Sequence, residues 1–189
     1  MMVAAFEEFL RSAFQERLGT LVGPPSVIEF RKLPEVTRVA SVFNSFEIAM
    51  GRRRRGGLGR RVDRLPAIGK SAELVVTGNL DPAALADIGA NPNSEAVLSL
   101  FKALDVAQIF ERVRGEFDLI WEKPEASTFL PDKLDEIVQR RHVVAHTADA
   151  LKITREQLHE AVGFLECLAT VLDDELARVV DGFRVAAAP

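Results

Sequence analysis

The sequence predicts an all-α fold, a helical bundle formed by a single domain over residues 1–189. Apolar residues recur at spacings of three and four along most of the chain, which is the period of a helix with one buried face. Glycine and proline separate the segments that have this period, as expected at helix ends. The run VIEF at 27–30 could form a strand, but it has no second strand with which to pair.

Composition is typical of a globular protein that is long enough to bury a sizeable core, with 48% hydrophobic and 28% charged residues. A net charge of −4 gives no general reason to expect a polyanion partner. The lone Cys167 excludes an internal disulfide and a multi-cysteine zinc site, and we expect it to be a small buried hydrophobe. The first residues lack the basic start of a signal peptide, and no run reaches transmembrane length. We therefore expect a cytoplasmic protein with no membrane partner.

Two amphipathic helices are expected in the first 50 residues. The first ends near Gly23 and has its apolar stripe at Phe6, Leu10, Ala13, Phe14, Leu18 and Leu21. A linker at 26–33 leads to the second, with apolar residues at Val36, Val39, Ala40, Phe43, Phe46 and Met50.

Residues 51–64, GRRRRGGLGRRVDR, hold seven arginines against one aspartate. Glycines at 51, 56, 57 and 59 disfavour a helix there, so we expect an exposed loop. Two interpretations stay open: a solvated charge run, or a clamp on the phosphate backbone of RNA. The candidate RNA-binding residues are Arg52, Arg53, Arg54, Arg55, Arg60 and Arg61.

Short elements are expected between 66 and 131. Glycine and proline break residues 66–92, where we expect one brief helix from an Asp81 cap through Ile88. Asn93 or Ser94 caps the next helix, with apolar residues Val97, Leu98, Phe101 and Leu104. Another helix ends at Trp121 before a proline, with apolar residues Phe110, Val113, Phe117 and Ile120.

The last helix begins at a capping box formed by Thr154 and Gln157. Its apolar seam alternates steps of four and three, which suits packing within a bundle or a dimer: Leu158, Val162, Leu165, Ala169, Leu172, Leu176 and Val179.

The central helix, residues 132–147 (DKLDEIVQRRHVVAHT), carries the candidate site. At about 100° per residue, Arg141 lies in the middle of an apolar stripe that should face the core. Such a cation must be paired, reach water along its stem, or point into a groove or subunit interface. His142 and His146 share the face beside that stripe, which favours a functional site. The stripe consists of Leu134, Ile137, Val138, Val144 and Ala145.

The segment from Arg141 to His146 resembles the R-x4-H motif of the HEPN superfamily (higher eukaryotes and prokaryotes nucleotide-binding domains). It is most similar to the RiboL-PSP branch, in which a stretch like Asn91-Pro92-Asn93-Ser94-Glu95 opens an earlier helix. The resemblance covers residues 90–180. It implies a HEPN-like helical bundle, with a long C-terminal helix packed on the motif helix.

The resemblance also implies a metal-independent endoribonuclease of the toxin or phage-defence kind, with Arg141, His146 and, ranked lower, His142 as catalytic residues. No cofactor is expected; the partners are RNA, a second copy in a homodimer, and an antitoxin or regulatory protein. Histidine can act as acid or base near neutral pH, and arginine stabilises phosphorane oxygens. Because Arg141 and His146 lie about 140° apart on an ideal helix, two copies related by a two-fold axis would complete one groove.

Several alternatives stay open. The chain could be a non-catalytic HEPN-like module for RNA or nucleotide binding, or a helical dimerisation protein. Asp135 could orient an imidazole or be an ordinary surface aspartate, and His159 is expected to be solvated. Some toxin members carry a tyrosine, modified by a partner nucleotidyltransferase, where this sequence has Ala148. The chain contains no tyrosine, so that mode of control is excluded.

Overall fold

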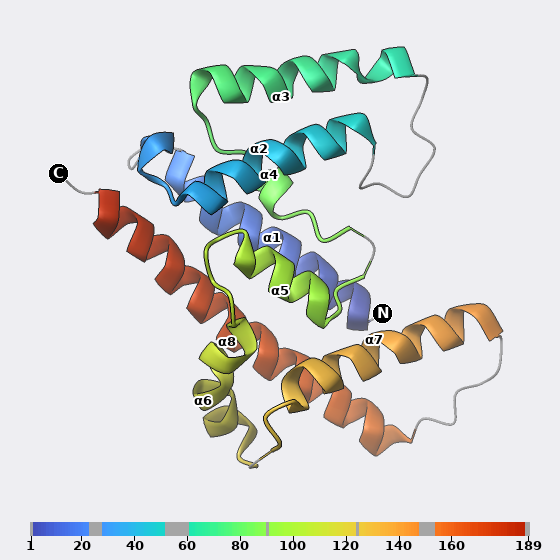
Figure 1. Ribbon diagram of the computed structural model, residues 1–189. Coiled ribbons are helices and arrows are strands. Elements are labelled where there is room, and N and C mark those ends of the chain that lie inside the picture. The colour runs from blue at the N-terminus through green and yellow to red at the C-terminus, as the bar shows by residue number, and fades with distance from the viewer. Residues whose placement is uncertain are drawn as a thin grey trace.

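The computed structural model describes residues 2–22, 28–51, 61–89, 91–123, 125–147 and 154–187, with all of their side chains except those of 61, 63 and 142–147. Throughout these ranges the chain is helical and no strand is present, so the all-α prediction is confirmed (Figure 1). Also in these ranges, no helix is long and apolar enough to cross a membrane.

Eight α-helices and two 3-10 turns follow one another in the described chain: α1 (Met2–Val22), η1 (Phe30–Lys32), α2 (Glu35–Met50), η2 (Arg61–Arg64), α3 (Leu65–Thr77), α4 (Pro82–Leu85), α5 (Ser94–Lys102), α6 (Ile109–Trp121), α7 (Phe129–Thr147) and α8 (Arg155–Ala187).

The long helix α8 is the spine of the molecule and packs along α1 and α6 (Figure 1). Its contacts with α7 are confined to the region where the two helices cross, through the rings of Phe129 and Phe164 and an ion pair between Lys133 and Glu160. The C-terminal helix α8 therefore contacts the motif helix where α7 crosses it, and packs more extensively along α1 and α6.

Buried side chains of α1 and α5–α8 form the core. The α1 stripe is buried as predicted, and the Phe14 ring contacts Phe101 edge-on at 5.1 Å. Polar contacts attach α8 to its neighbours. Arg17 of α1 binds both carboxylate oxygens of Asp173, at 3.2 and 2.7 Å, and the hydrogen bond raises the pKa of Arg17. Arg112 of α6 pairs with the buried Glu175 at 2.6 Å.

The orientation of α2 differs from that expected of an amphipathic helix. Its buried residues are Thr37, Ser41, Ser45 and Ala49, whereas the apolar Val36, Val39, Phe43 and Met50 are exposed. Ser41 and Ser45 bond Asp81, as acceptor from its backbone N–H at 2.8 Å and as donor to its carboxylate at 2.5 Å. Small side chains on this face let α2 approach α4 closely, so the apolar stripe lies on the opposite side.

Residues 65–77 form the regular helix α3, where the sequence predicted only broken structure. Pro66 lies in the first turn, where its missing N–H costs no hydrogen bond. Gly69 is accommodated within the helix, and Gly78 ends it in the left-handed conformation at φ 65°. The expected brief helix at Asp81 is present but ends at Leu85.

Caps at the other helices follow the sequence signals. The Asn93 side chain accepts from the N–H of Ala96 and caps α5. Thr154 and Gln157 exchange hydrogen bonds of 3.2 Å as a capping box at α8. Of the α6 residues expected in the core, Ile120 is instead exposed.

Candidate functional site

The motif helix α7 is held in the bundle by its N-terminal half. Leu130, Leu134, Ile137 and Val138 are buried, and Phe129 joins the aromatic cluster around Phe164. Beyond Val138 the helix continues outward from the body of the molecule (Figure 1). The end of α7 that carries the motif therefore extends away from the rest of the fold.

Arg141 lies where α7 leaves the core, and 43% of its side chain is exposed. Its Nη1 is 3.7 Å from the Oε2 of Glu7 on α1, and Glu7 also pairs with Arg11 at 3.2 Å. Among the described residues this is the only ion pair of Arg141. The expectation that Arg141 sits within the core-facing stripe is wrong, because 43% of its side chain is exposed and its guanidinium reaches the surface.

A long ion pair between partly exposed groups contributes little, about 0–1 kcal/mol. The Arg141 guanidinium therefore keeps most of its capacity to bind another anion. Arginine stays charged at any relevant pH and presents a planar fork that matches phosphate oxygens. The arrangement suits binding of a phosphate group.

The other cations of α7 have closer acids. Lys133 lies 3.3 Å from Glu136 and 3.2 Å from Glu160, and Arg140 pairs with Glu136 on the same helix. Arg141 therefore has the longest ion pair among the described cations of this helix.

The remaining predicted site residues lie outside the described side chains. α7 extends as a helix through Thr147, so His142 and His146 share one helix with Arg141 as predicted. Their side chains are not among those described. The same holds for Arg61, whose backbone begins η2, and for the predicted RNA-binding residues Arg52, Arg53, Arg54, Arg55 and Arg60.

Asp135 connects two stretches that the sequence singled out separately. Its carboxylate accepts hydrogen bonds from the backbone N–H and the hydroxyl of Ser94, both at 2.7 Å. The Asn91–Glu95 stretch is thereby attached to α7 at the start of α5. Asp135 therefore has a structural role at the surface, because it joins α7 to the start of α5.

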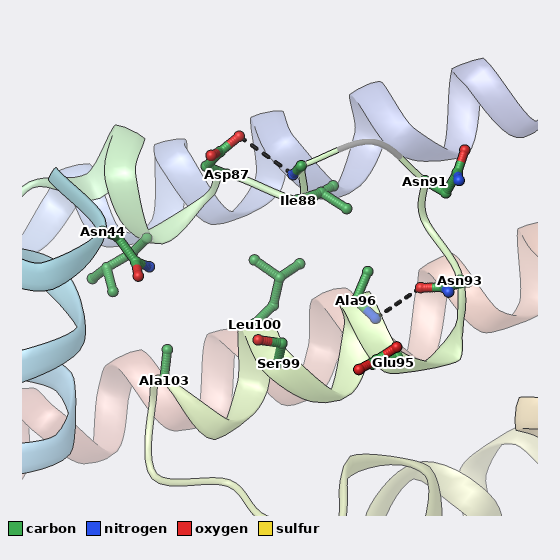
Figure 2. A pocket seen from close by; sticks show the side chains of 12 residues that line it. Asn44, Asp87, Ile88, Asn91, Asn93, Glu95, Ala96, Ser99, Leu100 and Ala103 are labelled. Atoms are coloured by element: carbon green, nitrogen blue, oxygen red, sulfur yellow. Dashed lines mark hydrogen bonds between the residues drawn. The ribbon is translucent and has the colours of Figure 1, made fainter. Parts of the chain in front are cut away.

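A groove of about 380 Å³ runs between α5 and the segment that precedes it (Figure 2). Apolar residues Leu85, Ile88 and Leu100 line its floor, and Figure 2 shows Ser99 and Leu100 on α5 below the 87–93 segment. Its polar lining is amide, hydroxyl and carboxylate: Asn44, Asp87, Asn91, Asn93, Glu95 and Ser99. Its lining among the described residues includes no lysine or arginine, the side chains that best bind a phosphate.

Other groups that could carry chemistry are less suited to it. Burial raises the pKa of the Cys167 thiol, which disfavours the reactive thiolate. His159 is exposed on α8, as predicted. In the part of the chain that the structure describes, no group of three or more His, Cys, Asp or Glu side chains could hold a metal ion.

Sequence reasoning missed Glu7 as the partner of Arg141. The two residues are 134 positions apart in the chain, and only the crossing of α1 and α7 brings them together. No sequence pattern around Glu7 indicates that it pairs with a residue of α7. The Asp135–Ser94 contact was missed for the same reason.

No protein-family model matches this chain, and neither does any curated protein or solved structure. The functional conclusion therefore depends on the chain's own residues.

Proposed function

We propose that this protein is a metal-independent endoribonuclease, with Arg141 and His146 as its catalytic residues and His142 in a supporting role. The observation that carries the proposal is the position of Arg141, which is partly exposed at the outer end of α7 with one distant acid partner. The histidines follow it on the same helix. A toxin or phage-defence role in the cytoplasm comes from the resemblance to the HEPN superfamily and from composition.

The reaction is an internal transesterification. The 2′-oxygen attacks the adjacent phosphorus while a neutral imidazole accepts its proton. The P–O5′ bond breaks as a protonated imidazole donates a proton to the departing 5′-oxygen. Arg141 stabilises the charge that builds on the phosphorane oxygens. The products are a 2′,3′-cyclic phosphate and a 5′-hydroxyl.

One helix does not supply all of these groups to one phosphate. Arg141 and His146 lie about 140° apart around an ideal helix, and the reaction needs both a base and an acid. Two copies of α7 related by a two-fold axis would contribute two arginines and two histidines to a common groove. The outward course of α7 supports this pairing, because the helix extends away from the rest of the molecule (Figure 1).

The arginine run of residues 52–61 would hold the RNA backbone away from the cleavage point. The run follows α2 and precedes η2 and α3 in the sequence, and in Figure 1 the end of α2 and the start of α3 lie on the same side of the view as the outer end of α7. Neutralising Arg52 to Arg55 should flatten the salt dependence of RNA binding, since each phosphate contact releases counterions. An unchanged slope would assign the run to solubility alone.

A second candidate is a non-catalytic HEPN-like module that binds RNA or nucleotide, or that mediates dimerisation. The ion pair between Arg141 and Glu7 favours it, because the pair gives Arg141 a role in attaching α7 to α1. In that case Arg141→Ala would change the free energy of unfolding, and neither wild type nor the variant would cleave RNA.

The test is cleavage of labelled single-stranded RNA in EDTA by wild type, Arg141→Ala and His146→Ala. Arg140→Ala and His159→Ala are matched controls, since Arg140 pairs within α7 and His159 is exposed on α8. We expect cleavage by wild type and both controls, loss of at least about 100-fold in the two site variants, and cyclic-phosphate ends. Uniform inactivity with retained RNA binding would establish the module instead.

A mixing experiment tests the shared groove. Arg141→Ala and His146→Ala proteins, each inactive alone, should regain part of the activity when their subunits exchange. An active wild type with no recovery on mixing would contradict a composite site while leaving the catalytic residues in place.

A further inference from the structure

The outer face of the α2–α3 hairpin is apolar and exposed, which is unusual for a helix pair. On α2 the exposed side chains are Val36, Val39, Phe43 and Met50, with 65% of Phe43 accessible. On α3 they are Leu65, Val75 and Val76, with 87% of Val76 accessible. We call these seven side chains the hairpin face.

Both stripes lie on the same side of the hairpin. A cavity of about 480 Å³ marks the inner side, toward α1 and α4, and its lining includes Ser45 from α2 and Ala67 and Leu74 from α3. At about 100° per residue, Leu65 and Val76 lie about 160° and 200° around α3 from Ala67 and Leu74. The exposed apolar residues of α2 also lie opposite the inner side of their helix.

On α2, the buried Ser41 points inward to the backbone N–H of Asp81. Relative to Ser41, Val39, Phe43 and Met50 lie about 160–200° around the helix. The hairpin face is therefore one surface that points away from the rest of the molecule.

The face is large enough for a stable contact. Scaled from the about 150–250 Å² that a large aromatic side chain can bury, the exposed fractions of the seven side chains correspond to roughly 700 Å². The largest apolar patch of a typical monomer is about 300–600 Å², and a standard interface buries about 800 Å² on each partner.

We infer that the hairpin face binds the same face of a second copy of this chain. A two-fold contact places a surface against itself, so a strongly charged face would repel its partner. The two helices carry three acids, Glu35, Glu47 and Glu73, and two bases, Arg38 and Lys70. This near balance of charge, together with the area, favours a second copy over a partner recognised through charge.

The arginine run fixes the orientation of the two copies. It begins directly after Gly51, at the end where α2 stops and α3 is about to start. A parallel pairing would place side by side the two helix ends that these arginines follow in the sequence, where like charges repel. An antiparallel pairing separates them and gives a four-helix arrangement with the middle of α2 near the two-fold axis.

This contact is independent of the proposed function, because α2 and α3 lie apart from α7 (Figure 1). The diagnostic is therefore the loss of association caused by a hairpin variant, compared with an equally exposed control elsewhere. The hairpin variant is Val39→Glu/Phe43→Glu. The control is Leu119→Glu on α6, where 80% of the residue is exposed.

Sedimentation equilibrium of the full chain, from about 1 to 200 µM, measures the association. We expect wild type and Leu119→Glu to reach the same largest assembly. Val39→Glu/Phe43→Glu should keep any pairing through α7, but its hairpin contact should be at least about 100-fold weaker, since the variant desolvates like charges across the axis. Circular dichroism checks that each variant is folded. Association unchanged in the hairpin variant, or a monomeric wild type, overturns the inference. A monomeric wild type that binds phosphatidylserine vesicles through Phe43 would make the face a lipid surface and also overturns it.

Disulfide formation in a Cys167→Ala background tests the orientation. Phe43→Cys, near the axis, should cross-link to its own copy, and Met50→Cys, near the end of α2, should not. The reverse result would overturn the antiparallel arrangement.

Discussion

Helices α1 and α2 have the same apolar spacing, but they bury opposite kinds of face. α1 buries its apolar stripe in the core against α8. α2 buries serine, threonine and alanine and exposes four residues of its apolar stripe, Val36, Val39, Phe43 and Met50. The difference teaches that a helical period identifies an amphipathic helix without identifying the partner of its apolar side.

Hydrogen bonding explains the orientation of α2. Ser41 and Ser45 satisfy the backbone N–H and the carboxylate of Asp81, which in turn caps α4 through the N–H of Ala84. A buried backbone donor without a partner costs about 1–3 kcal/mol. The polar face of α2 therefore stabilises the fold of one chain, and its apolar face is left for a second copy.

The largest effect is expected in α1. Phe14 is 1% exposed and packs on Phe101, so Phe14→Ala removes buried surface and leaves a cavity. We predict a loss of about 3–5 kcal/mol in the free energy of unfolding, measured by urea denaturation at low protein concentration. A loss below about 1 kcal/mol would mean that the α1 stripe is not core.

An intermediate effect is expected on the inner face of α2. Ser41→Ala removes the acceptor for the backbone N–H of Asp81, and should cost about 1–2 kcal/mol. Ser99→Ala is the matched control, because Ser99 is exposed and its hydroxyl has no hydrogen bond among the described residues. Equal stability of the two variants would refute the role given to the inner face.

The smallest effect on the isolated chain is expected at Phe43. Because 65% of Phe43 is exposed, Phe43→Ala should change the free energy of unfolding by no more than about 0.5 kcal/mol at low protein concentration. A cost near that of Phe14→Ala would show that the stripe is covered within one chain.

Much of the fold could be predicted from local signals. The α1 stripe, the Asp81 and Asn93 caps and the Thr154 capping box depend on neighbouring residues, and each was identified correctly. α3 was missed because Pro66 and Gly69 were taken as breaks, although proline is tolerated in a first turn.

The candidate site was predictable only in part. The sequence places Arg141 on a helix and beside two histidines, as the structure has it. It could not predict that Arg141 is partly exposed, or that Glu7 and Ser94 reach this helix from distant segments. Such contacts depend on how helices cross, which local periodicity does not encode.

The contrast between α1 and α2 is tested most directly by urea unfolding of wild type, Phe14→Ala and Phe43→Ala at about 1 and 100 µM protein. Association of folded chains stabilises them by mass action, so the wild-type midpoint should rise with protein concentration. Phe14→Ala should unfold at lower urea and keep that rise. Phe43→Ala should match wild type at the low concentration and show a smaller rise, because only the hairpin contact is weakened. A wild-type midpoint independent of concentration, or an undiminished rise in Phe43→Ala, would contradict the account.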